Sequence, residues 1–201
     1  DDFMEIQDLN LVNPASFSFW FKSDLSQGGK IYLSDYWESY WARYYGLSLG
    51  IGDDGIISVG IGDGSYPPRY IQTINSAQPG VWNHCVVTWE TDGAMALFIN
   101  GEESLTNEGG NASLQTAVPK NDGYNELIGK DYYVNGPHYY KGFLDDIYVF
   151  DRVLTQTEIL NLYNGENTSS DEEFDIELGD TIIICREDTI NLDAGTGFDA
   201  Y

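Results

Sequence analysis

Apolar residues recur in short runs along most of the chain, separated by glycine, asparagine and aspartate. Several of these runs alternate with polar residues, and others are rich in β-branched and aromatic side chains, as half-buried and buried strands are. The runs cover residues 3–6, 17–22, 30–34, 46–51, 56–61, 82–89, 95–99, 126–129 and 140–150. The pattern therefore predicts many short strands between residues 3 and 150.

The spacers between the runs predict how these strands are joined. Asp54-Gly55 and Asn100-Gly101 each lie between two apolar runs, and such dipeptides favour two-residue type I′ hairpin turns. Residues 62–79 and 108–119 are longer and polar, so we expect loops there. Short strands joined by tight turns predict an all-β fold, an antiparallel jelly-roll sandwich.

One short helix is predicted near the end of this domain, directly after the last apolar run. Thr155 is a suitable N-cap, and Glu158, three residues later, completes the sequence of a capping box. Ile159 and Tyr163 provide an apolar face, and Gly165 ends the helix.

The character of the sequence changes after Gly165, which predicts three parts. Residues 1–165 form the jelly roll, and residues 166–178 are an acidic linker. Residues 179–201 contain two further strand-like runs, and two strands alone are marginally stable. They are therefore either the start of a second domain or a tail that packs on the first.

Charge and cysteine content narrow the possible partners. The 33 acidic and 9 basic residues give a formal net charge of −24, which repels nucleic acids and anionic membranes. The acidic surface can equally serve only to keep the protein soluble. No apolar run approaches the roughly 20 residues that span a bilayer. The two cysteines, Cys85 and Cys185, are expected to be lone thiols, with Cys85 in the core.

Three segments together resemble the laminin-G-like, concanavalin-A-type jelly-roll domains of bacterial surface proteins. The first is Phe17-Ser18-Phe19-Trp20-Phe21-Lys22. The second runs from Trp82-Asn83-His84 through Leu97-Phe98-Ile99-Asn100-Gly101-Glu102, and the third is Gly142-Phe143-Leu144-Asp145-Asp146-Ile147 with Arg152-Val153-Leu154-Thr155. Such domains usually have a further strand before the segment that matches residues 1–6, and we expect this chain to lack it.

The tail resembles the opening of the Ig-like repeats near the C-termini of proteins exported by type IX secretion. This resemblance covers residues 179–201. It implies a secreted or cell-surface bacterial protein, in which the chain adjoins further domains.

The resemblance also implies a structural calcium ion near the closing strand. Asp145 lies where such domains have their signature carboxylate, and Asp1 and Asp2 match the acidic pair near the domain start. Calcium takes six to eight oxygen ligands, which carboxylates from opposite ends of a chain can supply. The alternative is that Asp145 or Asp146 caps a turn or accepts hydrogen bonds from backbone N–H groups.

A ligand-binding site is predicted in loops dense in aromatic residues. Aromatic faces stack on the C–H faces of sugars, while nearby polar groups bind hydroxyls. The candidate residues are Tyr36, Trp37, Tyr40, Trp41, Arg43, Tyr66, Arg69, Tyr133 and His138. The alternatives are that the rings pack over the sandwich edge, or that they bind a protein, since Tyr and Trp also dominate protein hot spots.

No catalytic residue is expected. Residues 173–177 match the E-x-D-x-E signature of laminarinase-like glycanases, but they lie in the acidic stretch beyond the helix rather than in a central strand. His84 belongs to a strand and is expected to be packed rather than catalytic. The sequence thus predicts a non-catalytic carbohydrate-binding or adhesion module with a calcium site. A structural or protein-binding module and, more remotely, a glycanase are the alternatives.

Overall fold

The computed structural model of the protein describes residues 3–7, 9, 15–24, 28–33, 37–38, 43–64, 69–110, 123–130 and 139–165. The chain divides into two compact units, residues 1–168 and 169–201, and every described residue belongs to the first. The predicted acidic linker and the tail resembling an Ig-like repeat lie outside the described residues.

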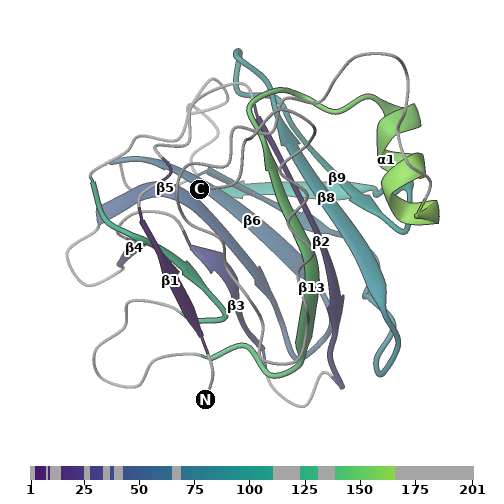
Figure 1. Ribbon diagram of the computed structural model, residues 1–201. Helices are drawn as coiled ribbons and strands as arrows, with labels where there is room; N and C mark the ends of the chain where they lie inside the picture. The colour runs from purple at the N-terminus through teal and green to yellow at the C-terminus, as the bar shows by residue number, and fades with distance from the viewer. Residues whose placement is uncertain are drawn as a thin grey trace, which may run out of the picture. The chain divides into compact units, whose positions relative to one another are not determined.

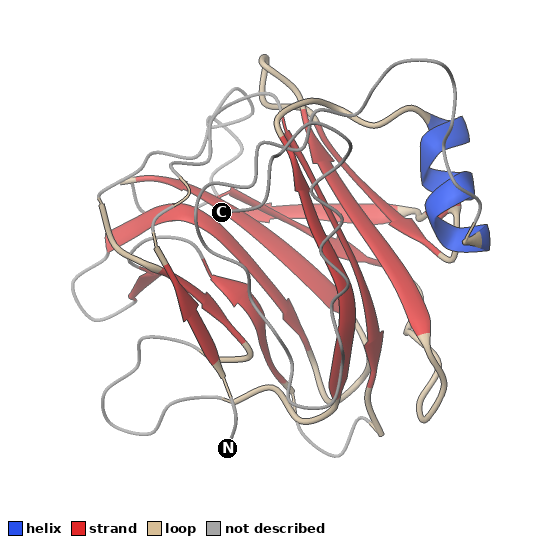
Figure 2. Cartoon of the chain, viewed as in Figure 1, coloured by secondary structure: helices blue, strands red, loops and turns tan. Residues whose placement is uncertain are grey.

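Two antiparallel sheets make up the described part of the chain (Figure 1, Figure 2). The eight-stranded sheet has the order β1 (Met4–Ile6), β12 (Glu126–Ile128), β3 (Gly29–Leu33), β5 (Arg43–Ile51), β6 (Ile57–Asp63), β7 (Arg69–Thr73) and β11 (Thr106–Gly110), with β4 (Trp37–Glu38) pairing with β5. The five-stranded sheet has the order β10 (Glu102–Glu103), β9 (Met95–Ile99), β8 (Asn83–Trp89), β2 (Ala15–Lys22) and β13 (Phe143–Phe150). The predicted all-β antiparallel sandwich is confirmed.

The hydrophobic core draws on alternate residues of both sheets. In β2 the buried residues Phe17, Phe19 and Phe21 belong to this core, because successive side chains of a strand point to opposite faces. In the other sheet, the matching sets are Leu47, Leu49 and Ile51 of β5 and Ile57, Val59 and Ile61 of β6. Cys85 is fully buried in the same cluster, as predicted.

The two predicted hairpin turns differ from each other. Asn100 and Gly101 both have positive φ, 53° and 84°, as a type I′ turn requires, and they join β9 to β10. At the other turn only Gly55 has positive φ, so the type I′ prediction for Asp54-Gly55 is wrong. The last pair of β5 and β6 is Ile51 with Ile57, which leaves five residues rather than two to make the connection.

Two segments that the sequence predicts as loops contain strands. β7 lies within residues 62–79, and β11 begins before the predicted loop at residues 108–119 and extends into it. The two strands pair with each other, from Thr106 opposite Thr73 to Gly110 opposite Arg69. Their side chains are largely polar, so the pattern carried little apolar signal, and the backbone pairing between them decides their conformation.

The predicted helix is α1 (Gln156–Asn164), capped as the sequence indicates. The Thr155 hydroxyl accepts from the Glu158 N–H, while the Glu158 carboxylate accepts from the Thr155 N–H at 2.7 Å. Gly165 ends the helix in the left-handed conformation, with φ 65°. Arg152 forms an ion pair of 2.6 Å with Glu158, which holds the pKa of that carboxyl down at about 2.

Helix α1 packs on the face of the five-stranded sheet that points away from the core (Figure 1). Ile159 and Leu154 are buried there against Val86 of β8, with Phe98 and Phe150 packed beside them. At the turn between β9 and β10, the Gln156 side-chain amide donates to the Gly101 carbonyl oxygen at 2.7 Å. The helix is thus tied to the sheet by both apolar and polar contacts.

A β-bulge interrupts β13. Asp145 is opposite Trp20 and Tyr148 is opposite Ser18, so Asp146 and Ile147 together face the single residue Phe19. Asp146 has a φ of 45°, unusual for a residue other than glycine. Within the described residues β13 is the last strand on its side of the five-stranded sheet.

Among the described residues, no helix is both long enough and apolar enough to span a membrane.

Candidate functional site

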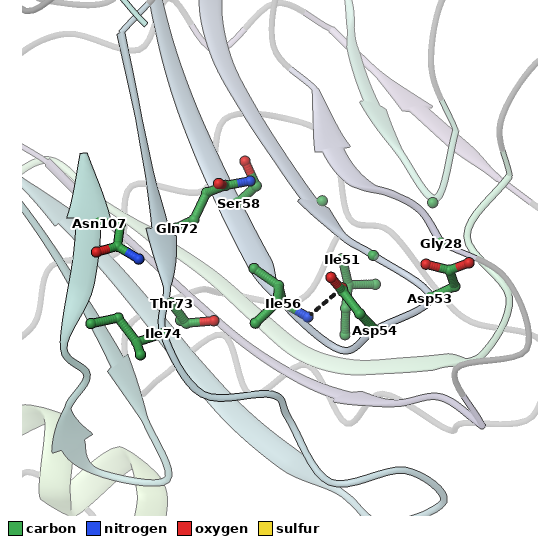
Figure 3. A pocket seen from close by; sticks show the side chains of 13 residues that line it. Gly28, Ile51, Asp53, Asp54, Ile56, Ser58, Gln72, Thr73, Ile74 and Asn107 are labelled. Carbon is green, nitrogen blue, oxygen red and sulfur yellow. Dashed lines mark hydrogen bonds between the residues drawn. The ribbon is translucent and has the colours of Figure 1, made fainter. Parts of the chain in front are cut away.

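A pocket of about 620 Å³ lies at the end of the eight-stranded sheet where β5 turns into β6 (Figure 3). This volume is within the range of small-ligand sites. Strands β5, β6, β7 and β11, together with the start of β3, contribute to its wall. The lining residues are Gly28, Gly29, Gly50, Ile51, Gly52, Asp53, Asp54, Ile56, Ser58, Gln72, Thr73, Ile74 and Asn107.

Strand register places a row of polar residues across this pocket. Gly50 is opposite Ser58, Ser58 is opposite Gln72, and Gln72 is opposite Asn107. Neighbouring strands are about 4.8 Å apart, so the row from Gly50 to Asn107 extends over about 14 Å. Ser58 and Gln72 alternate with the core residues of β6 and β7, which leaves them on the face opposite the core.

Glycines line the end of the pocket that lies away from Asn107. A Cβ atom on Gly28 would lie 2.9 Å from the Ile51 carbonyl oxygen, so the two backbone segments approach too closely for a side chain. Gly29, Gly50 and Gly52 line the same end. Without side chains there, backbone is accessible and a flat ligand can approach it closely.

The polar side chains of the pocket fall into two groups. Two of them serve the protein's own structure: the Asp54 carboxylate accepts from the Ile56 N–H at 3.0 Å, and the Thr73 hydroxyl accepts from the Ile57 N–H at 3.1 Å. The others make no side-chain hydrogen bond within the described part of the chain, namely Asp53, Ser58, Gln72 and Asn107. Two amides, a hydroxyl and a carboxylate are therefore available to a ligand.

The predicted aromatic site lies mostly outside the described residues. Tyr36, Tyr40, Trp41, Tyr66, Tyr133 and His138 are not described. Trp37 lies in β4 opposite Tyr44, and Arg43 begins β5 opposite Glu38. The pocket adjoins the far end of β5, seven residues further on, and at 3.3 Å per residue this separates the two places by about 23 Å.

Arg69, also predicted to bind ligand, is buried, with a side chain 5% exposed. Its Nη1 donates to the Gly93 carbonyl oxygen, and its Nη2 lies 3.3 Å from Glu108 Oε1. Glu108 belongs to β11, which pairs with the strand that carries Arg69, so the guanidinium joins the two strands as well as the Gly93 turn.

Of the three predicted calcium ligands, only Asp145 is described; it lies in β13 and is exposed, as is its neighbour Asp146. Asp145 Oδ1 accepts from the Asp146 N–H at 2.9 Å, which is the backbone-bonding alternative foreseen for this residue. Partial burial, followed by the charge of Asp145, raises the pKa of Asp146. No group of three or more His, Cys, Asp or Glu residues that could hold a metal occurs among the described residues. Asp1 and Asp2 are not described, so the calcium site stays a prediction.

His84 is packed, as predicted, with 1% exposure. Its Nε2 and the Ser18 hydroxyl lie 2.9 Å apart, and its ring faces those of Trp20 and Tyr163. Burial lowers the pKa of His84 to about 4, so the imidazole is neutral at pH 7. With both His84 and Ser18 buried, substrate has no access to this pair.

Sequence reasoning missed the pocket because its residues come from four separate segments of the chain, at residues 28–29, 50–58, 72–74 and 107. None of them forms a motif, and two of its strands were hidden in segments expected to be loops. The available signal was weak: the alternation of Tyr70-Ile71-Gln72-Thr73, and the glycines at 28, 29, 50 and 52.

Comparison with known proteins supports the fold and extends it to a family. Residues 1–160 match the sequence profile of the concanavalin A-like lectin/glucanases superfamily, in its Laminin_G_3 family. A search of curated protein sequences gave no match.

Several solved structures have a similar fold. A heptameric SAP-like pentraxin from Limulus polyphemus is 21% identical, with a TM-score of 0.56 over 80% of this chain and 74% of that one. The binding domain of botulinum neurotoxin DC, solved in complex with rat synaptotagmin II, is 18% identical with a TM-score of 0.54. A structure of botulinum neurotoxin type C, whose cell entry depends on interaction with two ganglioside molecules, is 18% identical with a TM-score of 0.53. The chain covers only 35% of each of these two toxin chains.

Proposed function

Because the chain belongs to the concanavalin A-like lectin/glucanases superfamily, we propose that it is a carbohydrate-binding module that binds its ligand without cleaving it. The pentraxin and the toxin structures share its fold, and the two toxins interact with a protein, synaptotagmin II, and with ganglioside molecules. These proteins support a binding role by analogy of fold. Because one fold can serve many functions, the site of this chain decides what it binds.

The pocket at the β5–β6 turn is the observation that carries the proposal. Its hydrogen-bonding groups at Ser58, Gln72 and Asn107 have no partner in the described part of the chain. A sugar offers hydroxyl groups that both donate and accept, and an amide side chain matches such a group with its carbonyl oxygen and its NH₂. The flanking apolar side chains of Ile56 and Ile74 suit the C–H face of the ring.

Three further features belong to the same proposal. The module is part of a secreted or cell-surface bacterial protein, where it contributes to adhesion. It holds a structural calcium ion, with Asp145 and the undescribed Asp1 and Asp2 among the ligands. The aromatic residues around Trp37 form a second place where the same ligand, or a longer one, is held. The motif at residues 173–177, beyond the described residues, is assigned no catalytic role.

Protein binding is the second candidate function, and the exposed aromatic residues of the five-stranded sheet favour it. Phe143 of β13 is 66% exposed, and its ring lies 6.4 Å from that of Trp82, which is 42% exposed. Exposed aromatic pairs of this kind are typical of protein contact surfaces. A surface-protein ligand would then be held on this sheet rather than in the pocket.

A glycan array with the purified chain tests the first proposal. We expect wild-type protein to bind a defined set of glycans, and the double variant Gln72→Ala/Asn107→Ala to lose at least tenfold in affinity. Each lost hydrogen bond to a hydroxyl is worth about 1 kcal/mol, so two together are worth about 2 kcal/mol, more than the roughly 1.4 kcal/mol that corresponds to tenfold. Titration calorimetry with the best array glycan measures the change.

Two control variants locate the effect. Asn164→Ala removes an exposed amide on α1 that does not line the pocket, and this variant should bind as wild type does. Trp37→Ala tests the aromatic segment. If Trp37→Ala abolishes binding while the double variant retains it, the site lies in the aromatic segment and not in the pocket. A wild-type protein that binds no glycan at all contradicts the carbohydrate-binding proposal.

A further inference from the structure

The charged side chains that line the pocket are of one sign. Among its described lining residues the charged side chains are Asp53 and Asp54, and the remaining polar ones are neutral. The formal net charge of −24 adds a negative field around the whole molecule. A ligand that enters this pocket therefore meets negative charge both at long range and in contact.

The two carboxylates differ in what they can do. The Asp54 carboxylate accepts a hydrogen bond from the Ile56 N–H and thereby stabilises the turn. Asp53 is exposed, has no hydrogen-bond partner in the described part of the chain, and lies at the glycine end of the pocket, as Figure 3 shows. Its pocket neighbours Gly28, Gly29 and Gly52 have no side chains that could shield it from a ligand. Asp53 is thus the carboxylate that a bound sugar would meet first.

We infer that the pocket selects glycans by charge, favouring those with free amino groups over neutral ones and rejecting those with carboxylate or sulfate groups. This rests on the proposed carbohydrate-binding function and names the class of ligand. At a distance of about 6 Å and an effective dielectric constant of about 40–80, one pair of like charges changes affinity about threefold to tenfold. An opposite charge at the same position gains a similar factor.

Lys30 is the basic residue that could oppose the negative charge of Asp53 in the pocket. Lys30 pairs with Gly50 in the β3–β5 ladder, and Gly50 lines the pocket, so this lysine occupies the next register position in the polar row. Its side chain lies outside the described residues. If it reached the pocket it would attract anions and oppose the effect of Asp53.

The experiment compares matched glycans on one array at low ionic strength. Lacto-N-neotetraose is compared with its sialylated form, and N-acetylchitotetraose with chitotetraose, which has free amino groups in place of the acetamides. We expect the sialylated form to bind at least threefold more weakly than its neutral partner, and chitotetraose at least threefold more tightly than N-acetylchitotetraose. Both differences should shrink in 1 M NaCl, because the Debye length falls to about 3 Å.

Three variants connect the effect to the pocket. Asp53→Asn removes one charge while nearly keeping the shape of the side chain. It should bring the affinity ratio of each glycan pair closer to one. Asp92→Asn makes the same change at an exposed turn residue that does not line the pocket, and should leave both ratios as in wild type. Lys30→Gln should also leave them unchanged.

The possible outcomes separate this inference from the proposed function. Neutral and sialylated partners that bind equally, or a sialylated preference that Lys30→Gln removes, overturn the charge selection while carbohydrate binding stands. Affinity ratios that Asp53→Asn leaves unchanged but Asp92→Asn alters also overturn the charge selection by the pocket, because the charge responsible then lies elsewhere on the protein. A protein that binds none of these glycans, and none on the wider array, overturns the proposed function and this inference with it.

Discussion

His84 shows how one buried side chain can make the stability of the domain depend on pH. Its imidazole lies against Trp20 and Tyr163, with Nε2 at 2.9 Å from the Ser18 hydroxyl. Among the described residues, Nδ1 has no hydrogen-bond partner. The His84 backbone N–H donates to the Asn100 side chain at 2.8 Å, so the residue also fixes the β9–β10 turn. Protonation would place a charge in this aromatic surrounding, and burial accordingly lowers the pKa of His84 from 6.5 to about 4.

The sign of the pH dependence follows from this shift. Between pH 6.5 and 4 the unfolded chain binds a proton at His84 that the folded chain does not, so the stability of the fold decreases as the pH falls through this window. At 1.36 kcal/mol per pKa unit, the loss from pH 6.5 to pH 5 is about 2 kcal/mol. We expect His84→Gln, measured by urea unfolding at pH 7 and pH 5, to lose less stability between the two pH values than wild type.

Ser18→Ala is the matched control, because it removes the hydroxyl but leaves the histidine that titrates. It should be less stable than wild type at both pH values and keep the wild-type pH dependence. The ion pair that lowers the pKa of Glu158 affects stability only below about pH 4.5, outside the range compared. Equal pH dependence in wild type and His84→Gln contradicts this account.

At the scale of elements, helix α1 depends on the turn between β9 and β10. Gly101 has a φ of 84°, and a Cβ atom there would lie 3.0 Å from Leu160 Cδ2 and 3.1 Å from Tyr163 Cδ1. A side chain at this position would therefore press on the helix, and Leu160 and Tyr163 would have to shift by a few tenths of an ångström. Trp20 stacks on Tyr163 from the sheet side, with 5.7 Å between ring centroids, so displacement of the helix also opens the surroundings of His84.

Gly101→Ala should destabilise the domain by about 2–4 kcal/mol. About 1–2 kcal/mol comes from the left-handed backbone, and about 1–2 kcal/mol from overpacking against the helix. Gly80→Ala is the matched control: Gly80 has a φ of 71° but nothing within 4 Å of the added Cβ, so only the backbone part applies. Thermal unfolding of both variants measures the difference. Equal destabilisation by the two substitutions would show that α1 does not press on this turn.

For the whole molecule, the charge of −24 on 201 residues is the dominant electrostatic property. Like charges repel more strongly in the compact state than in the unfolded chain, so screening by salt should raise the melting temperature. A bound calcium ion would add a specific contribution to this general effect, because a ligand that binds only the folded state stabilises it in proportion to its occupancy.

Melting with CaCl₂ and with NaCl at equal ionic strength separates the two contributions. We expect the melting temperature to be several degrees higher with calcium, and a chelator to reverse the increase. Asp145→Asn should abolish the calcium-specific increase, whereas Asp53→Asn, which removes one charge elsewhere, should retain it. Equal melting temperatures in the two salts would remove the calcium site from the proposal.

The sequence predicted the elements whose conformation is decided locally. The alternating phenylalanines of β2, the Asn100-Gly101 turn and the capping box of α1 each contain their own structural information. The strands β7 and β11 were missed because their stability comes from pairing with other strands: β7 pairs with β6 and with β11, and β11 lies more than 30 residues further along the chain. The pocket could not be foreseen for the same reason: Ser58, Gln72 and Asn107 become neighbours only through the register of three strands.

The bulge of β13 has a consequence for how the protein behaves at high concentration. A regular edge strand with exposed Phe143, Tyr148 and Val149 would be a template on which another chain could extend the sheet. At Asp146 the backbone turns out of register, and two adjacent carboxylates stand where an incoming strand would have to align. A foreign strand can therefore match only a few residues on either side of the bulge. Within the described residues β13 ends its side of the sheet, and Asp145 and Asp146 oppose extension of the sheet there. Asp145, a predicted calcium ligand, would thus also limit aggregation.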